Sequence, residues 1–316
     1  AFRNEVRSWL AANLPEDIRQ KVVGYQGLSK DDYIRWHKIL AAKGWSVPHW
    51  PVEWGGTGWN ITQRYIYDEE FGVAGAPNLP PFGPAMCASV LLRFGSPEQK
   101  ARFLPRIRDG LDFWVQGYSE PGAGSDLAAL KTKAVRDGDH YVVTGQKIWT
   151  TLGHYGDMIF ALVRTSRGER RQQGITFVLC DLRSPGVRVR PIRTLANDER
   201  LCEVFFESVR VPVENLVGAE NTGFLQIAQA FVSERVGLAV QAYSSAQRCL
   251  DITVAWCRDR ETFGRPLISR QSVQNTLAEM ARRVDVARVY SRRVVERQLE
   301  GENNLIAEVC FAKNTA

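Results

Sequence analysis

QGYSEPGAGSD, residues 116–126, is the most informative segment of the chain. Gly122 and Gly124 allow the backbone to approach a ligand closely, and hydroxyl groups on both sides could bond to that ligand. The segment is not a dinucleotide fingerprint, because Leu127 stands where the third glycine of G-x-G-x-x-G would be. No Walker A sequence is present either. A nucleotide cofactor would therefore have to be held in another way. By itself the segment is more often an ordinary Gly/Pro turn than a ligand site.

Two further motifs follow this segment along the chain. QKIWTT, residues 146–151, lies among strand-like alternation, and RETFGRP, residues 260–266, lies in a helical region. Each is weak alone, because a strand tryptophan is usually a core residue and an arginine at a helix end is usually solvated. The specific signal is the order of the three motifs within a helix–sheet–helix plan.

The periodicity of apolar residues divides the chain into three regions. We expect an α+β multidomain protein with an N-terminal helical domain over 1–112 and a small central β domain, barrel or sandwich, over 113–220. A C-terminal helical bundle is expected over 221–316. At roughly 100–200 residues per domain, the length is compatible with two or three domains.

Local signals support this division. Ser29 with Asp32 predicts a capping box at a helix start, and Asp137-Gly138 predicts a hairpin turn. Residues 224–254 and 273–294 carry apolar positions at helical spacing over lengths typical of bundle helices. Residues 263–266, Phe-Gly-Arg-Pro, interrupt them.

The composition is that of an ordinary globular protein. The 316 residues include 41 Lys or Arg and 35 Asp or Glu, a formal net charge of +6. The two signs are interleaved, which argues against a nucleic-acid partner, and no apolar run approaches the ~20 residues of a membrane helix. The six cysteines form no C-x-x-C pair and the four histidines are scattered, so we expect no metal site. Residues 1–5 lack a secretory signal pattern, and we expect a cytoplasmic protein.

The three motifs, together with FRNEV at 2–6, resemble those of the acyl-CoA dehydrogenase family over essentially the whole chain. WPVEWGGTGW at 50–59 and Arg193-Thr194-Leu195 are similar to bacterial members, among them pimeloyl-CoA dehydrogenase large subunits. The resemblance implies an oxidoreductase of fatty-acid β-oxidation type. Such a flavoprotein converts an acyl-CoA thioester to the trans-2-enoyl-CoA with FAD.

The resemblance also implies which residues contact the flavin. Tyr118 and Ser119 would lie along the flavin ring, although most relatives carry threonine where this chain has Ser119. Trp149 would pack near the ring and Thr151 would hydrogen-bond near the atom that receives hydride.

Further FAD contacts would reach a neighbouring subunit. By resemblance, Arg260 pairs with the diphosphate of the neighbour's FAD, and Phe263 and Gln271 are additional contacts. A homodimer, commonly a homotetramer, or a heterotetramer with a paralogous subunit would then be part of the site.

The substrate residues implied by the resemblance are Ser125, Phe231 and Arg235, with Ser125 near the CoA part. Removal of the α-proton needs a carboxylate in a dry pocket, where desolvation raises its pKa. Glu234 matches the position from which part of the family supplies this base. Other members supply it from a C-terminal loop that would lie beyond residue 316, and Glu234 would then only pair with an arginine.

Electrons would pass to an electron-transferring flavoprotein. The alternatives are an acyl-CoA oxidase type of member that uses oxygen, or a non-catalytic subunit of a heteromeric dehydrogenase. The acyl chain of the substrate is not readable from the sequence. By the family pattern the chain ends inside its helical bundle, before a glycine-rich flavin-contacting segment, so we expect a truncated or naturally reduced member.

Overall fold

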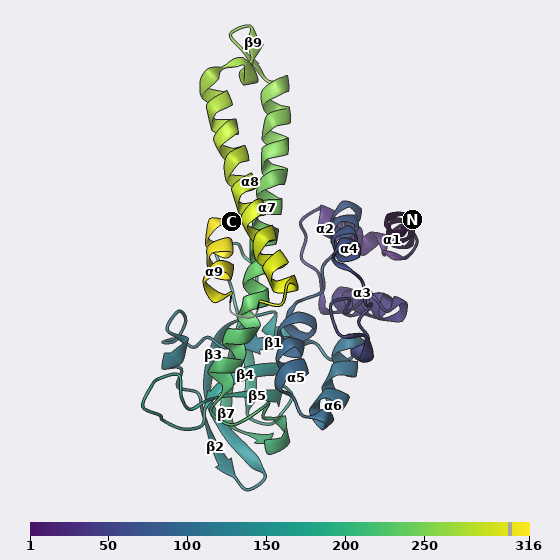
Figure 1. The fold of residues 1–316 in the computed structure, drawn as a ribbon. Helices are drawn as coiled ribbons and strands as arrows, with labels where there is room; N and C mark the ends of the chain where they lie inside the picture. The colour runs from purple at the N-terminus through teal and green to yellow at the C-terminus, as the bar shows by residue number, and fades with distance from the viewer. Residues whose placement is uncertain (303–304) are drawn as a thin grey trace. The chain divides into compact units, whose positions relative to one another are not determined.

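A computed structural model of the chain describes residues 1–302 and 305–316. They form two compact units, Ala1–Ile227 and Ala228–Ala316. The first unit contains the N-terminal helices and a β-sheet, and the second consists of helices and one short hairpin (Figure 1). The order of helices, sheet and helices confirms the predicted α+β architecture. The predicted domain boundaries at 112/113 and 220/221 stay predictions.

Three of the α-helices before the sheet begin with polar capping boxes that the sequence encodes, at Ser29, Asn60 and Ser96. They are α1 (Phe2–Asn13), α2 (Glu16–Val23), α3 (Lys30–Lys43), α4 (Ile61–Ala74), α5 (Ala88–Phe94) and α6 (Pro97–Arg108), with a π-helical segment η2 (Phe82–Cys87) before α5. The predicted capping box of Ser29 and Asp32 starts α3, and Ser96 caps α6 in the same way. Trp36, fully buried, lies in the aromatic core of this region.

The strands of the first unit form one seven-stranded sheet in the order β1-β4-β2-β3-β7-β6, with β5 paired to β4. Their bounds are β1 (Trp114–Gly117), β2 (Lys133–Asp137), β3 (His140–Thr151), β4 (Met158–Arg164), β5 (Ile175–Asp181), β6 (Val187–Ile192) and β7 (Leu201–Pro212). Short helical turns lie between them at η3 (Leu127–Ala129) and η4 (Gly153–Tyr155). A third turn, η5 (Val213–Asn215), follows β7, and η1 (Val52–Trp54) precedes α4. The predicted hairpin joins β2 to β3, but its turn lies one residue later, since Asp137 pairs with His140.

Two bulges interrupt the pairing of β3 with β7. Lys147 pairs with Val204 and Thr150 with Cys202, so β3 carries one extra residue between these pairs. Trp149, with a φ of +63°, lies at this bulge. A bulge changes which face of the sheet successive side chains point to. Lys147 is therefore buried while Trp149, two residues later, is exposed.

The second unit is dominated by two long helices, α7 (Gly223–Asp259) and α8 (Gln271–Leu299), which run side by side in opposite directions (Figure 1). Leu250 and Cys257 of α7 pack with Leu277 of α8. The connection contains the two-residue strands β8 (Glu261–Thr262) and β9 (Arg265–Pro266) and the turn η6 (Leu267–Ser269). The predicted pair of long helices with an interruption at 263–266 is confirmed. A further helix, α9 (Ile306–Thr315), packs on them through Val309.

Candidate functional site

The segment after β1 and the end of β3 lie against each other. The backbone amide of Ile148 donates to the carbonyl of Ser119 at 2.9 Å. Beyond Ser119 the chain turns back on itself, because Glu120 and Ala123 exchange two backbone hydrogen bonds of 3.0 Å. The structure therefore brings together two of the motifs that the sequence analysis selected, although they are far apart along the chain.

Trp149 is the most unusual residue of this region. Its indole is 55% exposed, and its backbone is in the left-handed region that a bulky side chain rarely adopts. Such conformations cost free energy and collect at ligand-binding sites. An exposed aromatic face held in this way provides a surface on which a planar ring can pack.

Three residues close to Trp149 in the fold carry hydroxyl groups: Thr150 and Thr151 on the same strand, and Ser119, whose carbonyl is bonded to Ile148. Ser119 and Thr151 are half-buried, and within the described part of the chain neither side-chain hydroxyl makes a hydrogen bond. The hydroxyl of Thr150 is buried and also lacks a partner among these residues. An exposed indole with uncommitted hydroxyl donors suits the ring of a flavin, which is flat and carries acceptors along its edge.

Tyr118 adds a further aromatic ring. It contacts Phe160 of β4 edge to face, with ring centroids 5.6 Å apart, and also contacts Phe177 of β5. The segment that carries Tyr118 and Ser119 is therefore packed against β4 and β5 through the Tyr118 ring.

A buried ion pair joins the two motifs, because Glu120 belongs to the first and Lys147 to the second. Lys147 is fully buried, and its ammonium donates to Glu120 Oε1 at 2.8 Å and to the carbonyl of Tyr118 at 3.2 Å. Burial lowers the pKa of Lys147 to about 8, against the opposing influence of the Glu120 carboxylate. Burial alone would raise the pKa of Glu120, but the Lys147 charge and several hydrogen bonds lower it overall.

Sequence reasoning assigned no role to Lys147 or Glu120. The signal was nevertheless present, because Lys147 continues the inward-facing positions of Tyr141 and Val143 along β3. A lysine at an inward position of a strand requires a buried partner.

Ser125, the predicted contact to CoA, lies in the exposed segment beyond the turn. Its neighbour Asp126 forms an ion pair with Arg171 at 3.0 Å. The Arg164 guanidinium donates to the carbonyls of Ala128 and Arg171, and so ties the segment of Ser125 to the loop between β4 and β5.

In the second unit, the predicted base and two predicted substrate contacts share one stretch of α7. The Arg235 guanidinium lies 5.6 Å from the centre of the Phe231 ring. Burial raises the pKa of Glu234, and the charge of Arg235 opposes this only partly. A carboxylate with a raised pKa suits a general base, although the role of Glu234 stays a prediction.

The predicted contacts to a neighbouring subunit lie at the connection between α7 and α8. Phe263 is 97% exposed with a φ of +53°, and the Arg270 guanidinium lies 5.4 Å from the centre of its ring. Arg260 precedes β8, and its carbonyl accepts from Leu267 at 2.8 Å. Gln271 is the first residue of α8. The structure thus gathers Arg260, Phe263 and Gln271 at one end of the hairpin.

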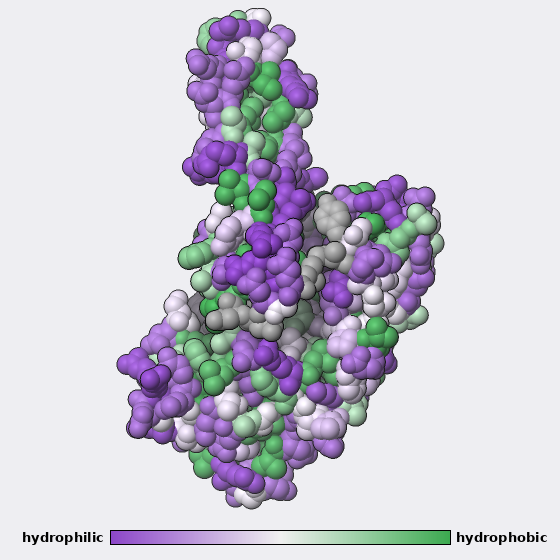
Figure 2. Space-filling model, viewed as in Figure 1, coloured by the Kyte–Doolittle hydropathy of each residue, from purple (hydrophilic) through white to green (hydrophobic). Residues whose placement is uncertain are grey.

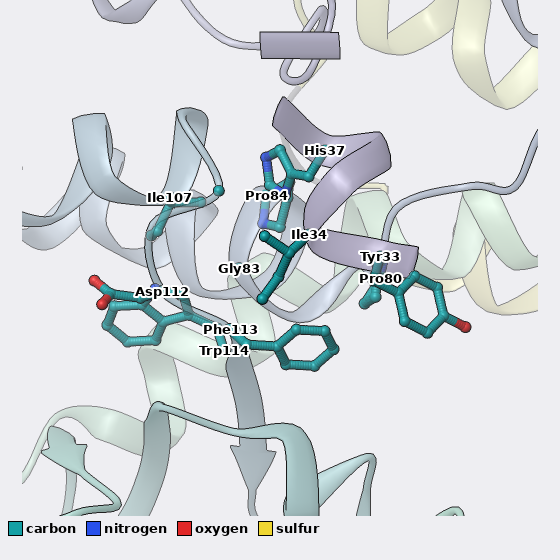
Figure 3. A pocket seen from close by; sticks show the side chains of 11 residues that line it. Tyr33, Ile34, His37, Pro80, Gly83, Pro84, Ile107, Asp112, Phe113 and Trp114 are labelled. Atoms are coloured by element: carbon teal, nitrogen blue, oxygen red, sulfur yellow. The ribbon is translucent and has the colours of Figure 1, made fainter. Parts of the chain in front are cut away.

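A small cavity of about 30 Å³ lies elsewhere in the first unit, between α3 and the start of β1 (Figure 3). It is lined by residues that include Tyr33, His37 and Trp114. His37 is hydrogen-bonded to the carbonyl of Arg108, and burial lowers its pKa to about 4, so it is neutral at neutral pH. The cavity has room for water but not for a flavin or a thioester.

The described residues contain neither a metal-binding cluster nor a membrane-spanning helix. Within residues 1–302 and 305–316, no three His, Cys, Asp or Glu side chains gather in a way that could hold a metal ion. No helix in that part of the chain is both long and apolar enough to cross a membrane.

Comparison with known proteins identifies the family. Models of the N-terminal, middle and C-terminal domains of acyl-CoA dehydrogenases match residues 1–110, 116–209 and 221–316. The chain is 38% identical over 291 residues to acyl-CoA dehydrogenase IpdE1 of Mycobacterium tuberculosis, covering 90% of this chain and 69% of that protein. It is 40% identical over 238 residues to the IpdE1 of Mycolicibacterium smegmatis, covering 71% of this chain and 61% of that protein, which is less than two thirds.

A solved structure with the same fold is that of the ChsE4-ChsE5 complex from Mycobacterium tuberculosis. Its chain superposes with a TM-score of 0.81 at 32% identity, over 99% of this chain and 79% of that one. The class defined by these matches is the flavoprotein oxidoreductases that act on acyl-CoA. The chain belongs to the acyl-CoA dehydrogenase family.

Proposed function

We propose that this protein catalyses the FAD-dependent α,β-dehydrogenation of an acyl-CoA thioester to the trans-2-enoyl-CoA. The observation that carries the proposal is the exposed indole of Trp149 on a strand end that is bonded to Ser119, since an exposed aromatic face with nearby hydroxyls suits a flavin ring. Membership of a family whose members are flavoproteins supports the same cofactor.

In this proposal each residue has a defined role. Trp149 and Tyr118 pack near the ring, while Ser119 and Thr151 hydrogen-bond to its edge. A bound flavin supplies the acceptor for the β-hydride of the substrate. Glu234 takes the α-proton of the thioester, and its raised pKa favours proton transfer because the carboxylate is a stronger base than a solvated one.

The substrate and the oligomer follow from the same proposal. Ser125, Phe231 and Arg235 contact the acyl-CoA, and Arg260, Phe263 and Gln271 contact the FAD of a neighbouring copy or of a paralogous subunit. The exposure of Phe263 supports such a contact, because a large apolar ring left open to solvent at the end of a hairpin is typical of an interaction surface. The ChsE4-ChsE5 structure is itself a complex of two named proteins, which supports a heteromer as one form.

Anaerobic reduction of the flavin tests the proposed reaction. The purified chain, reconstituted with FAD, should be yellow and should bleach when a suitable acyl-CoA is added. A screen of straight, branched, aromatic, dicarboxylyl and steroid-side-chain thioesters would identify the acyl group. If the chain takes up no FAD on reconstitution, the non-catalytic subunit is the correct alternative.

The electron acceptor needs a second measurement. We propose an electron-transferring flavoprotein, so turnover with that protein or an artificial acceptor should greatly exceed hydrogen peroxide formation in air. Peroxide formed at the rate of substrate oxidation would instead identify an oxidase.

A further inference from the structure

We propose that the buried ion pair of Glu120 and Lys147 is a positioning device for the flavin-binding surface. It fixes the backbone of Tyr118 and Ser119 relative to the bulge of β3 at which the Trp149 side chain is exposed. The proposal rests on the proposed function, because it assumes that these residues face a flavin.

The contacts of Lys147 join the two motifs. Its ammonium donates to the Tyr118 carbonyl at 3.2 Å and to Glu120 Oε1 at 2.8 Å, on either side of Ser119. The adjacent amide of Ile148 donates to the Ser119 carbonyl at 2.9 Å. Three consecutive residues after β1 are thus attached to two consecutive residues of β3.

The contacts of Glu120 anchor this assembly to a third element. Its carboxylate accepts from the backbone amides of Lys131 at 2.6 Å and Thr132 at 2.9 Å, just before β2. At Gly145 the strand β3 approaches the same place so closely that a Cβ atom would lie 2.5 Å from the Thr132 hydroxyl oxygen. The carboxylate therefore fixes the segment that follows β1 relative to both the start of β2 and the middle of β3.

The position of Lys147 in β3, next to the bulge, links the ion pair to the placement of Trp149. Only the bulge separates the inward Lys147 from the outward Trp149, so a shift of the pairing at Lys147 would change where the indole lies. Buried ion pairs are weak sources of stability, because apolar pairs of similar volume are often equally stable. Their better-attested contribution is to select one register among several.

Variants without the charges test the proposal. In Glu120→Gln/Lys147→Met the amide oxygen can still accept a backbone hydrogen bond, but no ammonium reaches Tyr118. Glu120→Gln alone removes the carboxylate, and Lys147 can then lose its proton rather than remain as an isolated charge. Both variants should unfold cooperatively, yet bind FAD at least tenfold more weakly, with a visible flavin spectrum closer to that of free FAD.

The matched control is Glu70→Gln/Arg7→Met. Glu70 is another buried carboxylate of the first unit, paired with Arg3 and Arg7 between α1 and α4. Within the described residues its ion pairs involve none of the flavin-binding residues. This control should retain the FAD affinity and spectrum of the unaltered chain.

Three results would overturn the proposal. The first is unaltered FAD affinity and spectrum in either folded variant. The second is failure of both variants to fold while the control folds, which would assign the pair to general stability. The third is an unaltered chain that takes up no FAD, which refutes the proposed function as well and is thereby distinguished from the first two.

Discussion

Glu234 is the residue that we propose as the base for removal of the α-proton. Glu234→Gln should leave the chain yellow with bound FAD but abolish flavin reduction by acyl-CoA, because an amide cannot accept the α-proton. Anaerobic stopped-flow absorbance of the flavin measures this directly. Glu207→Gln, a change of an exposed glutamate on β7, should reduce at the normal rate. If Glu234→Gln is reduced normally, the base lies elsewhere.

The same residue predicts a pH dependence. The base acts as a carboxylate, so the rate of flavin reduction should fall as the pH drops through the pKa of Glu234. Because burial raises that pKa, the fall should begin at a higher pH than for a solvated glutamate. A rate of reduction that is constant down to pH 4 would contradict the assignment.

Trp149 combines a functional side chain with a strained backbone. Trp149→Gly and Trp149→Ala both remove the indole, but only glycine adopts a positive φ without strain. We expect the glycine variant to be more stable than the alanine variant by about 1 kcal/mol, while both bind FAD more weakly. Thermal unfolding and FAD titration of the two variants measure the two effects separately. Equal stability of the two variants would show that the bulge relaxes.

Among the elements, α3 shows how a cap produces acid sensitivity. Burial alone would raise the pKa of Asp32, but hydrogen bonds from Lys21 and Ser29 outweigh it and lower this pKa to about 2. The stabilising contribution is therefore complete above the unfolded value near 3.8 and is lost as the pH falls towards 2. We expect about 1–2 kcal/mol to disappear in this range.

Denaturant unfolding between pH 5 and pH 2 checks this loss. Asp32→Asn should be less stable at pH 5 but should lose less stability on acidification than the unaltered chain. Asp31→Asn, an exposed neighbour outside the capping box, should follow the unaltered chain. Parallel curves for all three proteins would contradict the expectation.

Elements with strong local signals could be predicted from the sequence. The Ser29 box, the hairpin near Gly138 and the long helices each depend on residues close together in the chain. By contrast, the eight residues of α2 carry too short a pattern to be recognised, and β7 extends beyond the predicted Val204–Phe206 on both sides. Its length depends on pairing with both β3 and β6, which no local pattern reports.

In the candidate site too, some residues could be predicted from the sequence and others could not. Tyr118, Ser119, Trp149 and Thr151 could be selected because their motifs resemble those of a family, and the structure brings the two motifs together. The bulge at Trp149 and the pair of Glu120 with Lys147 could not be derived, because they arise from register between distant segments. Whether Glu234 is the base also depends on packing that the sequence does not encode locally.

At the scale of the whole molecule, the hairpin of α7 and α8 carries exposed apolar residues. Figure 2 shows apolar side chains along this hairpin among polar ones. The exposed residues include Ile252, Trp256 and Phe263. Apolar surface of this kind is typical of a protein–protein interface and supports the proposed oligomer.

Mixing two inactive variants tests whether sites are shared between copies. If Arg260 serves the neighbour's FAD, a hybrid of Glu234→Gln and Arg260→Ala copies contains one site with both residues intact. Dehydrogenase activity should then return after the two proteins are unfolded and refolded together, whereas each refolded alone should stay inactive. No recovery in a mixture shown to contain hybrid oligomers would place Arg260 in its own subunit's site.

The exposed end of that hairpin also has a consequence for how cofactor binding and subunit association depend on each other. When Arg260 and Phe263 complete a neighbour's cofactor site, dilution that separates the copies also releases flavin, and added FAD promotes their reassociation. Cofactor content would then report the degree of assembly, and newly made chains would remain inert until they had met a partner.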